Sequence, residues 1–494
     1  MTLERPARMF DRDREWKALS AFIDDPRPGA TLGVVSGRRR QGKTFLLRSL
    51  CEAAGGFYFP ADEGIDRESL NKLGALLGQF TGAPGPIAFE GWHQAVDALL
   101  GLSHDRRIPV VIDEFPYLVR ANPSLPSIIQ NALAPLRPER DNSRVGLLLC
   151  GSAMSFMGRL LSGNAPLRGR AGLELMVPTL DHRLAAEFWG VDDPVTALMT
   201  HAVVGGTPAY RSDFARDDKP AGPDDFDAWV IRTVLSPASP LFREARYLLA
   251  DEPDLHDSSL YHSVLAAIAS GNAQRGAIAS YMGRKTGDLA HPLTVLEDCG
   301  LIVREPDVFK DNRTTFRIAE PLVTFYHAVM RPIWSDLEFT DDTARLWRRS
   351  RARFVSGVLG PHFEQVCRFW TRHMAPPELF GDYPNVAGAG TVNDPTNRTS
   401  HEVDVVVFGL DDDNRRPLLA IGEVKWGETM GLGHVERLRR IRALLVAQKR
   451  LGAETARLAC YSGTGFAPEL VEAAAREPEI VLVGLTDLYR AGPT

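Results

Sequence analysis

The segment from Gly37 to Thr44 has the residue types and spacing of a phosphate-binding loop. It reads GRRRQGKT, a GxxxxGKT pattern, between an apolar run at 32–36 and a stretch with helical character. Glycines allow backbone N–H groups to close around phosphates, and the start of a helix favours negative charge. We therefore expect Gly37, Gly42, Lys43 and Thr44 to bind ATP, with Lys43 on the β and γ phosphates and Thr44 on Mg²⁺.

Polar residues follow two further apolar runs. PVVIDEF carries Asp113 and Glu114 at the end of a strand candidate, and VGLLLC at 145–150 leads into Ser152. In phosphoryl transfer one carboxylate holds the metal and a second group orients the attacking water. We expect Asp113 to hold Mg²⁺ and Glu114 to be catalytic. Ser152 is either a polar sensor at the γ-phosphate or a helix N-cap.

Two arginines in PLRGRAG, Arg168 and Arg170, are candidates for an arginine finger or charge sensor. The alternative is that both are solvated surface residues.

The C-terminal block carries a second set of acidic residues. Asp404 lies in EVDVVV, and Glu423 and Lys425 lie in GEVKW. Residues two apart share a face of a strand, so Glu423 and Lys425 point the same way beside Asp404. Carboxylates without histidine suit Mg²⁺ or Mn²⁺, and the lysine can position or help deprotonate a water. We expect Asp404, Glu423 and Lys425 to be catalytic, with Asp404, Glu423 and Glu364 as metal ligands; a surface salt bridge is the alternative.

Two arginine-rich stretches are candidates for phosphate contacts with DNA. One spans 345–354, and the other is a helix after the acidic motif on which Arg437, Arg440 and Lys449 are expected to share a face. Such faces are more often simply solvated.

The elements that must position these residues follow from hydrophobic patterning. From 30 to 190, apolar runs alternate with helical stretches, which predicts a parallel sheet with crossover helices. Three strands are expected, at 32–36, 110–112 and 145–150.

The middle of the chain has the pattern of a winged helix. Helices are expected at 260–269, 274–281 and 286–299, followed by a hairpin of IVRE and TTFRI. Arg284, Lys285 and Arg313 are candidates for phosphate contacts at the helix start and the wing tip. A rigid spacer or protein-contact module is the alternative.

The length of 494 residues predicts about three domains. Polar stretches at 216–227 and 335–353 indicate a boundary or hinge. We place a P-loop ATPase with lid at 1–245, a winged helix at 246–335 and a nuclease-like domain at 336–494.

The amino-acid composition excludes several classes of protein. Apolar residues make up 44% and charged residues 24%, which rules out wholesale disorder. The net charge of −6 does not indicate a nucleic-acid binder, so any such argument must be local. The five scattered cysteines favour buried thiols over a zinc or disulfide site. No apolar stretch is long enough to span a membrane, so we expect a cytoplasmic protein.

The motifs together resemble the archaeal-type ATPase family, a branch of the AAA+/STAND-like P-loop ATPases. FDRDREWKAL, GRRRQGKT, VVIDEF, LLLCGSAMSFM, PLRGR and GGTPAY occur in that family's order, and the similarity covers roughly 8–330. It implies that Phe10 and Arg12 lie near the adenine, that Pro208 packs on the base, and that Arg170 fits the motif better than Arg168. Gln41 departs from the family's small apolar residue, which puts little in doubt because this side chain need not face phosphate.

The Asp404, Glu423 and Lys425 pattern resembles the PD-(D/E)xK restriction-endonuclease-like family, in its variant fused behind archaeal-type ATPases. The implied architecture is α/β: an AAA+-like ATPase with a helical lid, a winged helix, and a C-terminal endonuclease-like α/β domain.

These features predict an ATP-hydrolysing, nucleotide-regulated DNA-processing protein with a metal-dependent nuclease domain, acting as a homo-oligomer. A STAND-type signalling or scaffold ATPase whose last domain binds nucleic acid or a partner protein without cleaving is the alternative. A replication-initiator or transposition regulator would need sequence-specific binding by the winged helix, for which the sequence offers little.

Overall fold

The computed structural model describes residues 3–250, 258–339 and 342–490, which form two compact units. The first runs to Thr179 and also includes Asp298–Gly300, while most described residues from Leu180 onward belong to the second. The Pro- and Asp-rich stretch at 216–227 therefore does not separate the units. It lies in the second, where Arg232 forms ion pairs with Asp218 and Asp225. The predicted boundaries at 245 and 335 remain predictions.

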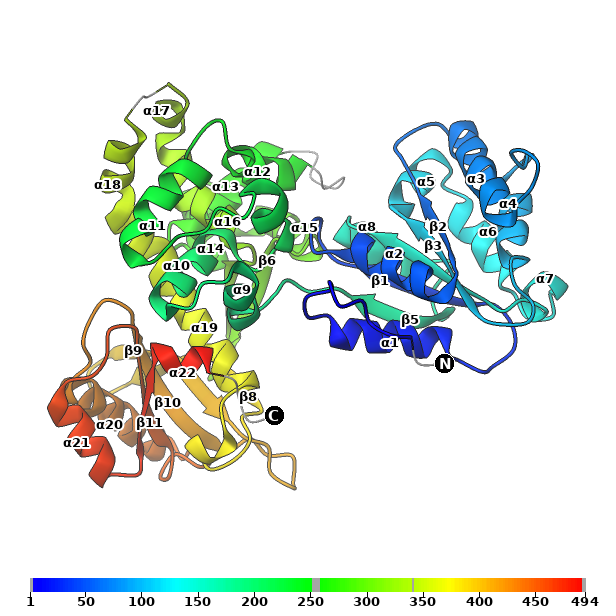
Figure 1. Ribbon diagram of the computed structural model, residues 1–494. Helices are drawn as coiled ribbons and strands as arrows, with labels where there is room; N and C mark the ends of the chain where they lie inside the picture. The colour runs from blue at the N-terminus through cyan, green and yellow to red at the C-terminus, as the bar shows by residue number, and fades with distance from the viewer. Residues whose placement is uncertain (1–2, 251–257, 340–341, 491–494) are drawn as a thin grey trace. The chain divides into compact units, whose positions relative to one another are not determined.

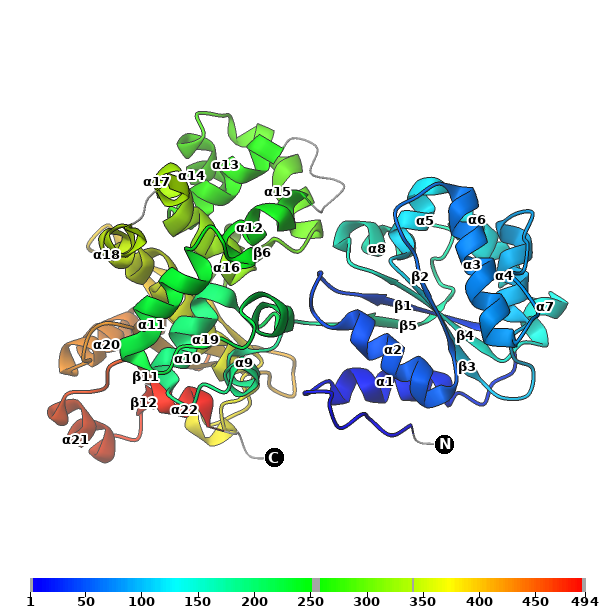
Figure 2. The same cartoon turned by 45° about the horizontal axis from the view of Figure 1, so that its top comes forward.

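The first unit is built on a five-stranded parallel sheet of order β2-β3-β4-β1-β5. Its strands are β1 (Thr31–Ser36), β2 (Phe57–Pro60), β3 (Ile108–Asp113), β4 (Val145–Gly151) and β5 (Ala171–Met176). Its helices are α1 (Asp13–Ile23), α2 (Lys43–Ala54), α3 (Asp66–Thr81), α4 (Trp92–Leu100), α5 (Phe115–Ala121), α6 (Leu125–Ala132), α7 (Pro138–Asp141) and α8 (Met154–Leu161). Figures 1 and 2 show helices on both faces of this sheet.

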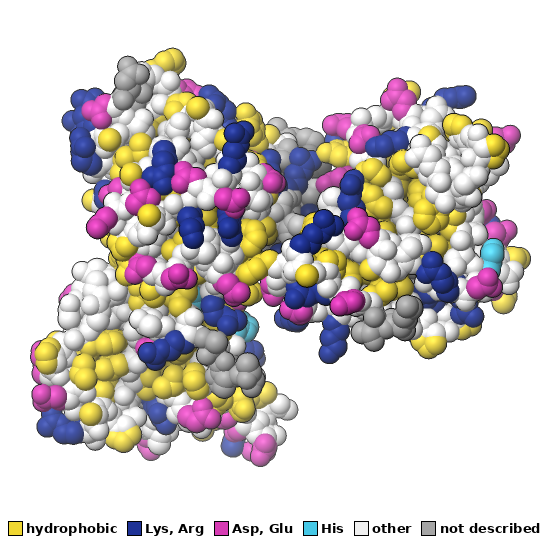
Figure 3. Space-filling view, in the orientation of Figure 1, with side chains coloured by type: hydrophobic (Ala, Val, Ile, Leu, Met, Phe, Trp, Pro, Cys, Tyr) yellow, Lys and Arg dark blue, Asp and Glu magenta, His cyan; other side chains and the backbone are white. Residues whose placement is uncertain are grey.

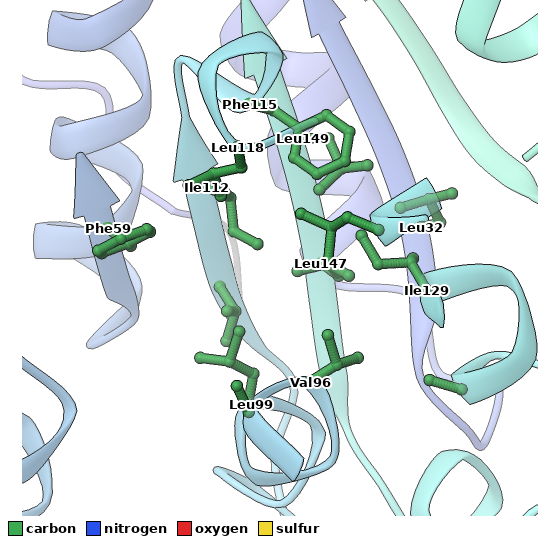
Figure 4. Packing of buried hydrophobic residues seen from close by; sticks show 14 of the residues in the cluster. Leu32, Phe59, Val96, Leu99, Ile112, Phe115, Leu118, Ile129, Leu147 and Leu149 are labelled. Carbon is green, nitrogen blue, oxygen red and sulfur yellow. The ribbon is translucent and has the colours of Figure 1, made fainter. Parts of the chain in front are cut away.

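The central strands are apolar throughout because each face is covered by a different group of helices. Leu147 and Leu149 of β4 pack with α3 to α6, whereas Leu148 packs with α1 and α2 on the opposite face. Figure 4 shows the first of these clusters, with Leu147, Leu149 and Ile112 against residues from the covering helices. This packing fixes the strand ends that carry the phosphate loop and the acidic pair.

The three predicted strands are confirmed, but the sheet has two more that the sequence analysis missed. β2 has only four residues, too few for a clear pattern. β5 is an edge strand whose side chains alternate between half-buried and exposed, unlike the continuous apolar runs of the covered strands.

The second unit begins with helices. These are α9 (His182–Trp189), α10 (Pro194–Val204), α11 (Pro223–Trp229) and α12 (Pro240–Ala250), with π-helical turns at Tyr210–Phe214 and Val230–Val234. The predicted winged-helix elements follow as α13 (Ser258–Ala269), α14 (Arg275–Tyr281), a 3₁₀ turn at Thr286–Leu289, α15 (Ala290–Asp298) and the hairpin β6 (Ile302–Asp307) and β7 (Lys310–Ile318). Residues 251–257 of the span assigned to it lie outside the described residues.

The remainder of this unit combines helices with a mixed sheet. The helices are α16 (Pro321–Phe325), α17 (Trp334–Phe339), α18 (Thr343–Phe354) and α19 (Gly360–His373), and further turns lie at Tyr326–Met330, Arg331–Ile333, Val355–Leu359 and Pro377–Leu379. The sheet has the order β12-β11-β10-β9-β8. Its strands are β8 (Val386–Asp394), β9 (Thr399–Phe408), β10 (Leu418–Lys425), β11 (Arg457–Ser462) and β12 (Ile480–Gly484). The helices that connect or follow these strands are α20 (Leu432–Ala447), α21 (Pro468–Arg476) and α22 (Leu485–Tyr489). β8, β9 and β10 are antiparallel neighbours, and β10, β11 and β12 are parallel.

The turn between β6 and β7, Val308 and Phe309, is the tip of the predicted wing and is docked on this sheet. Val308 donates its backbone N–H to the Ala389 carbonyl at 3.1 Å, and Phe309 packs edge-on against Phe408. Both tip side chains pack against the core cluster of the C-terminal sheet. Arg313, a predicted phosphate contact, instead lies 3.6 Å from Glu402 of β9. The predicted wing therefore contacts the C-terminal sheet of the same chain.

A histidine pair, half-buried at His201 and buried at His362, joins α10 to α19. His201 Nδ1 and His362 Nε2 are 2.8 Å apart, so one ring donates a hydrogen bond to the other. Burial lowers the pKa of His201 to about 3 and holds the pKa of His362 well below its usual range. Both imidazoles are therefore neutral in the folded protein near neutral pH.

This pair predicts that the protein loses stability on mild acidification. An unfolded histidine titrates near pH ~6.5, so below that pH the unfolded state binds more protons than the folded state until the lower folded pKa is reached. We expect the unfolding temperature to fall between about pH 7.5 and about pH 5, and to fall less in His201→Gln, whose amide still donates to His362. Scanning calorimetry at both pH values checks this, and equal pH dependence in the two proteins would contradict it.

The cysteines and the apolar character of the helices were both subjects of expectations from composition. All five cysteines are buried free thiols, as expected. No helix within the described ranges has the length and apolar character needed to cross a membrane.

Candidate functional site

The phosphate loop joins β1 to α2 in the predicted arrangement. Gly42 is the N-cap of α2 with a φ of 89°, a left-handed conformation that favours glycine. At Gly37 a Cβ atom would lie 2.6 Å from the Val177 carbonyl oxygen, so a larger residue does not fit. The Lys43 ammonium donates to the carbonyls of Gly37 at 2.6 Å and Arg38 at 2.8 Å, and burial lowers its pKa. The loop thus surrounds the lysine that is expected to reach phosphate.

Asp113 lies at the end of β3, beside Thr44. The Thr44 hydroxyl donates to Asp113 Oδ2 at 2.8 Å, and the Tyr58 phenol donates to the same oxygen. Asp113 is buried, and its Oδ1 accepts the Glu114 backbone N–H at 3.0 Å. A hydroxyl and a carboxylate in contact supply hard oxygen ligands, which suits Mg²⁺. The structure therefore brings together the two residues predicted to hold this metal.

Glu114 is held by the residue that follows β4. The Ser152 hydroxyl lies 3.1 Å and 3.0 Å from the two Glu114 carboxylate oxygens. The N-cap of α8 is Ala153, so Ser152 is not the cap. Of the two interpretations of Ser152, the structure retains the one that places its hydroxyl beside the acidic pair.

Two further residues of this network were not predicted. Arg39 donates to the Ser152 hydroxyl at 3.3 Å and to the Tyr117 hydroxyl at 2.8 Å. Tyr58, the donor to Asp113, lies on β2, a strand the sequence analysis missed. Arg39 lies inside the recognised loop, but the motif leaves its residue type open, so no pattern identified its partner.

The N-terminal segment reaches the phosphate loop through Arg12. Its guanidinium donates to the Gln41 carbonyl at 3.1 Å and lies 3.7 Å from Glu15, and burial lowers its pKa. The Gln41 side chain is buried, and its Oε1 would lie 3.0 Å from a Cβ on Gly37. The expectation that the Gln41 side chain need not face phosphate stays a prediction. Whether Phe10 and Arg12 lie near an adenine remains a prediction.

The two candidate finger arginines differ in their contacts. Arg168 donates to the Gly163 carbonyl at 2.7 Å and so closes a local turn. Arg170 is exposed and forms no ion pair with any described residue. Pro208 is half-buried in the second unit, and its packing against a base remains a prediction.

The C-terminal acidic motif lies on the neighbouring strands β9 and β10. Asp404 Oδ2 accepts the Val424 N–H at 2.8 Å, and the Asp404 carbonyl accepts from Arg368 of α19 at 3.0 Å. Arg368 also lies 3.5 Å from Glu364. Burial raises the pKa of Asp404, and the nearby Glu423 charge adds to this; burial likewise raises the pKa of Glu364. The predicted carboxylates therefore share one partly desolvated region.

Glu423 is neutralised by two cations. Lys425 Nζ lies 3.1 Å from Oε1, and Arg437 Nη1 of α20 lies 2.9 Å from Oε2. Arg437 also donates to the Glu402 carbonyl at 2.7 Å, so it contacts the motif directly. Lys449, predicted on the same helix face, follows the end of α20 in a left-handed conformation and does not share that face.

The donor types fit a hard divalent cation, but the carboxylates are not arranged as a formed metal cluster. In the part of the chain that the structure describes, no group of three or more His, Cys, Asp or Glu side chains has the geometry to hold a metal ion. Asp404 and Glu423 would hold such an ion only with a change in the contacts to Val424, Lys425 or Arg437.

The strand order β2-β3-β4-β1-β5, the loop between β1 and α2 and the acidic pair after β3 define the first unit as a P-loop ATPase-type α/β core. It is followed by a helical region and a C-terminal mixed sheet.

No protein-family model matches the chain. An uncharacterized protein of Methanocaldococcus jannaschii, MJECL04, is 27% identical over 332 residues, which cover 66% of this chain and 70% of that protein. The Walker-type ATPase PABY2304 of Pyrococcus abyssi is 20% identical with a TM-score of 0.49, covering 66% of this chain and 99% of that chain. The ORC2 protein of Aeropyrum pernix, in its ADPNP–ADP complexes, is 15% identical with a TM-score of 0.42, covering 71% and 97%. These values are too low to carry a functional argument, so the class rests on the chain's own strand order and loop.

Proposed function

We propose that the protein binds and hydrolyses ATP and uses its nucleotide state to control a metal-dependent nuclease activity of its C-terminal domain. The observation that supports the first half is the meeting of Lys43, the Thr44–Asp113 pair and the Glu114–Ser152 pair at one edge of the parallel sheet. The second half is supported by Asp404 and Glu423 on adjacent strands, with Lys425 two residues further on.

In the ATPase site each residue has a distinct task. When ATP binds, the Lys43 ammonium replaces its hydrogen bonds to the Gly37 and Arg38 carbonyls with contacts to phosphate oxygens. Thr44 and Asp113 would hold Mg²⁺, which neutralises charge on the β and γ phosphates when bound. Glu114 accepts a hydrogen bond from the attacking water, and Ser152 fixes the direction of its carboxylate.

In the C-terminal domain Asp404 and Glu423, with Glu364 nearby, would hold Mg²⁺ or Mn²⁺, which polarises a phosphodiester when bound. Lys425 leaves its ion pair with Glu423 to orient the attacking water. Arg437 remains beside the carboxylate and stabilises negative charge on phosphate. The substrate proposed is DNA.

Arg170 supports a homo-oligomeric ATPase. Because its side chain is exposed and has no ion pair among the described residues, it is available to the nucleotide of a neighbouring subunit. Such a finger stabilises the charge of the transition state in trans.

A second function has one observation in its favour. Lys425 and Arg437 already neutralise Glu423, which is the expected state of a domain that binds without cleaving. The protein would then be a STAND-type signalling or scaffold ATPase. A nucleotide-dependent change of size in light scattering, together with no metal-dependent cleavage, would favour this function.

The proposal is tested by measuring ATP hydrolysis and DNA cleavage on the same preparation. We expect Mg²⁺-dependent phosphate release, and cleavage that requires Mg²⁺ or Mn²⁺ and is lost in Asp404→Asn. Phosphate release without cleavage would leave only the scaffold function.

Tyr58 provides a test specific to this structure. Its phenol donates to the Asp113 oxygen that also meets Thr44, so it competes with a metal or its water for that oxygen. We expect Tyr58→Phe to lower the Mg²⁺ concentration needed for half-maximal ATP hydrolysis by about tenfold to 100-fold, because a hydrogen bond to a charged group is worth about 1.5–3 kcal/mol. A magnesium titration checks this, and a higher magnesium requirement would show that the phenol supports the site.

A further inference from the structure

A large cleft lies within the second unit, beside the acidic motif. It has a volume of about 1370 Å³ and is bounded by the wing strands β6 and β7, by α18 and α19, and by β8 and β9. Asp404 and Glu364 are among its lining residues. Small-molecule pockets are usually about 300–1,000 Å³, so the size favours part of a polymer over a metabolite.

Arginines reach this cleft from three of its walls. They are Arg304, Arg313, Arg317, Arg353, Arg368 and Arg372. Four of them form ion pairs with glutamates: Arg304, Arg313, Arg317 and Arg368. Arg353 of α18 is exposed and has no ion pair with any residue in the described ranges, and Arg372 of α19 donates only to a backbone carbonyl, that of Pro384. Figure 3 shows Lys and Arg side chains gathered over the α17–α18 end of this unit. Cationic groups without acidic partners are free to meet a polyanion.

An aromatic side chain lies among these arginines. Phe369 of α19 lines the cleft and is 39% exposed, although most large apolar residues of this unit are buried. Its ring lies 4.8 Å from that of His373, another lining residue. A cationic groove with an exposed aromatic face is the usual means of binding single strands, because every base can stack on a ring.

The docked wing removes one of the two contacts that a winged helix can make with a duplex. The recognition helix, here the predicted α15, enters a groove, and the wing adds a second contact only if its tip is free. Here the wing tip is held by the Val308 backbone hydrogen bond to Ala389 and by Phe309 against Phe408, so the wing forms a wall of the cleft. We propose that this cleft binds single-stranded nucleic acid, with a base on Phe369 and backbone phosphates on Arg353 and Arg372, and leads the strand to Asp404. The last step rests on the nuclease function proposed above.

The test measures binding without metal, so that it does not depend on cleavage. Fluorescence anisotropy of a labelled oligothymidylate or oligouridylate is followed with the full chain in EDTA. We expect Phe369→Ala and Phe369→Leu to weaken binding of the preferred strand about tenfold, because stacking of one base contributes about 1–3 kcal/mol. Arg353→Ala should weaken it about fivefold. Unlabelled duplex should compete at least tenfold less well than unlabelled single strand.

Arg416→Ala is the matched control, because Arg416 is an exposed arginine of the loop after β9 that does not line the cleft. It should change affinity less than about twofold. Native affinity in the Phe369 and Arg353 variants, equal losses in Arg416→Ala and Arg353→Ala, or equal competition by duplex would overturn the proposal. Phe369→Leu keeps an apolar side chain, so a loss in this variant with an unchanged unfolding temperature is not a folding defect. Loss of binding in the cleft variants, together with no cleavage by the native protein, would support nucleic-acid binding in the cleft and reject the proposed nuclease function.

Discussion

Replacement of Lys43 by alanine is expected to abolish ATP hydrolysis and to weaken ATP binding strongly. The Lys43 ammonium is the only cation that the loop encloses between the Gly37 and Arg38 carbonyls in the described structure, so its loss removes the positive charge that faces the β and γ phosphates. Loss of one such transition-state contact commonly costs about 100-fold to 1,000-fold in rate. Steady-state phosphate release and binding of a labelled ATP analogue measure the two effects.

Two comparison variants test whether these losses are specific to the Lys43 side chain. Lys17→Ala removes an exposed lysine of α1 in the same unit and should leave both properties unchanged. Glu114→Gln should retain ATP binding and lose hydrolysis, because it keeps the shape but not the charge of the group that orients water. Hydrolysis at the native rate by Lys43→Ala would reject the ATPase assignment.

The second large effect is expected at Asp404. Asp404→Asn should reduce metal-dependent DNA cleavage by about 100-fold or more, because the substitution removes a metal-ligating charge while its amide oxygen can still accept the Val424 N–H. Cleavage of plasmid and single-stranded DNA in Mg²⁺ and in Mn²⁺ measures this effect.

The matched control is Asp412→Asn, at an exposed aspartate of the following loop. It should cleave as the native protein does. Because burial raises the pKa of Asp404, removing its charge is not expected to destabilise the fold, and unfolding temperatures of both variants should be close to native. Equal cleavage by Asp404→Asn and the native protein would place any nuclease activity elsewhere.

The ATPase site was largely predictable because its chemistry depends on local sequence. A motif fixes Lys43 and Thr44 at the start of a helix, and an apolar run ending in Asp113 and Glu114 marks the strand beside it. Parallel strands then bring these ends to one edge. The Ser152 contact with Glu114 could not be predicted from the sequence alone, because a serine at this position also suits a helix N-cap.

The parts of the fold and site that could not be predicted depend on contacts between residues far apart in the sequence. Tyr58 lies on a four-residue strand whose place beside β3 is not apparent from its own sequence. The wing resembles a free hairpin in sequence, yet Val308 and Phe309 find apolar partners about 80 to 100 residues later in β8 and β9. The pairing of Arg437 with Glu423 joins a helix to a strand in the same way, and neither segment alone indicates this ion pair.

The most direct test of the account is DNA cleavage with and without ATP, measured for the native protein, Lys43→Ala and Asp404→Asn. We expect the native protein to cleave only with Mg²⁺ or Mn²⁺ and at rates that differ between the two nucleotide conditions. Lys43→Ala should cleave at one rate whether or not ATP is present, and Asp404→Asn should not cleave in either condition. Native cleavage that is absent under every condition, or indistinguishable from that of Asp404→Asn, would contradict it.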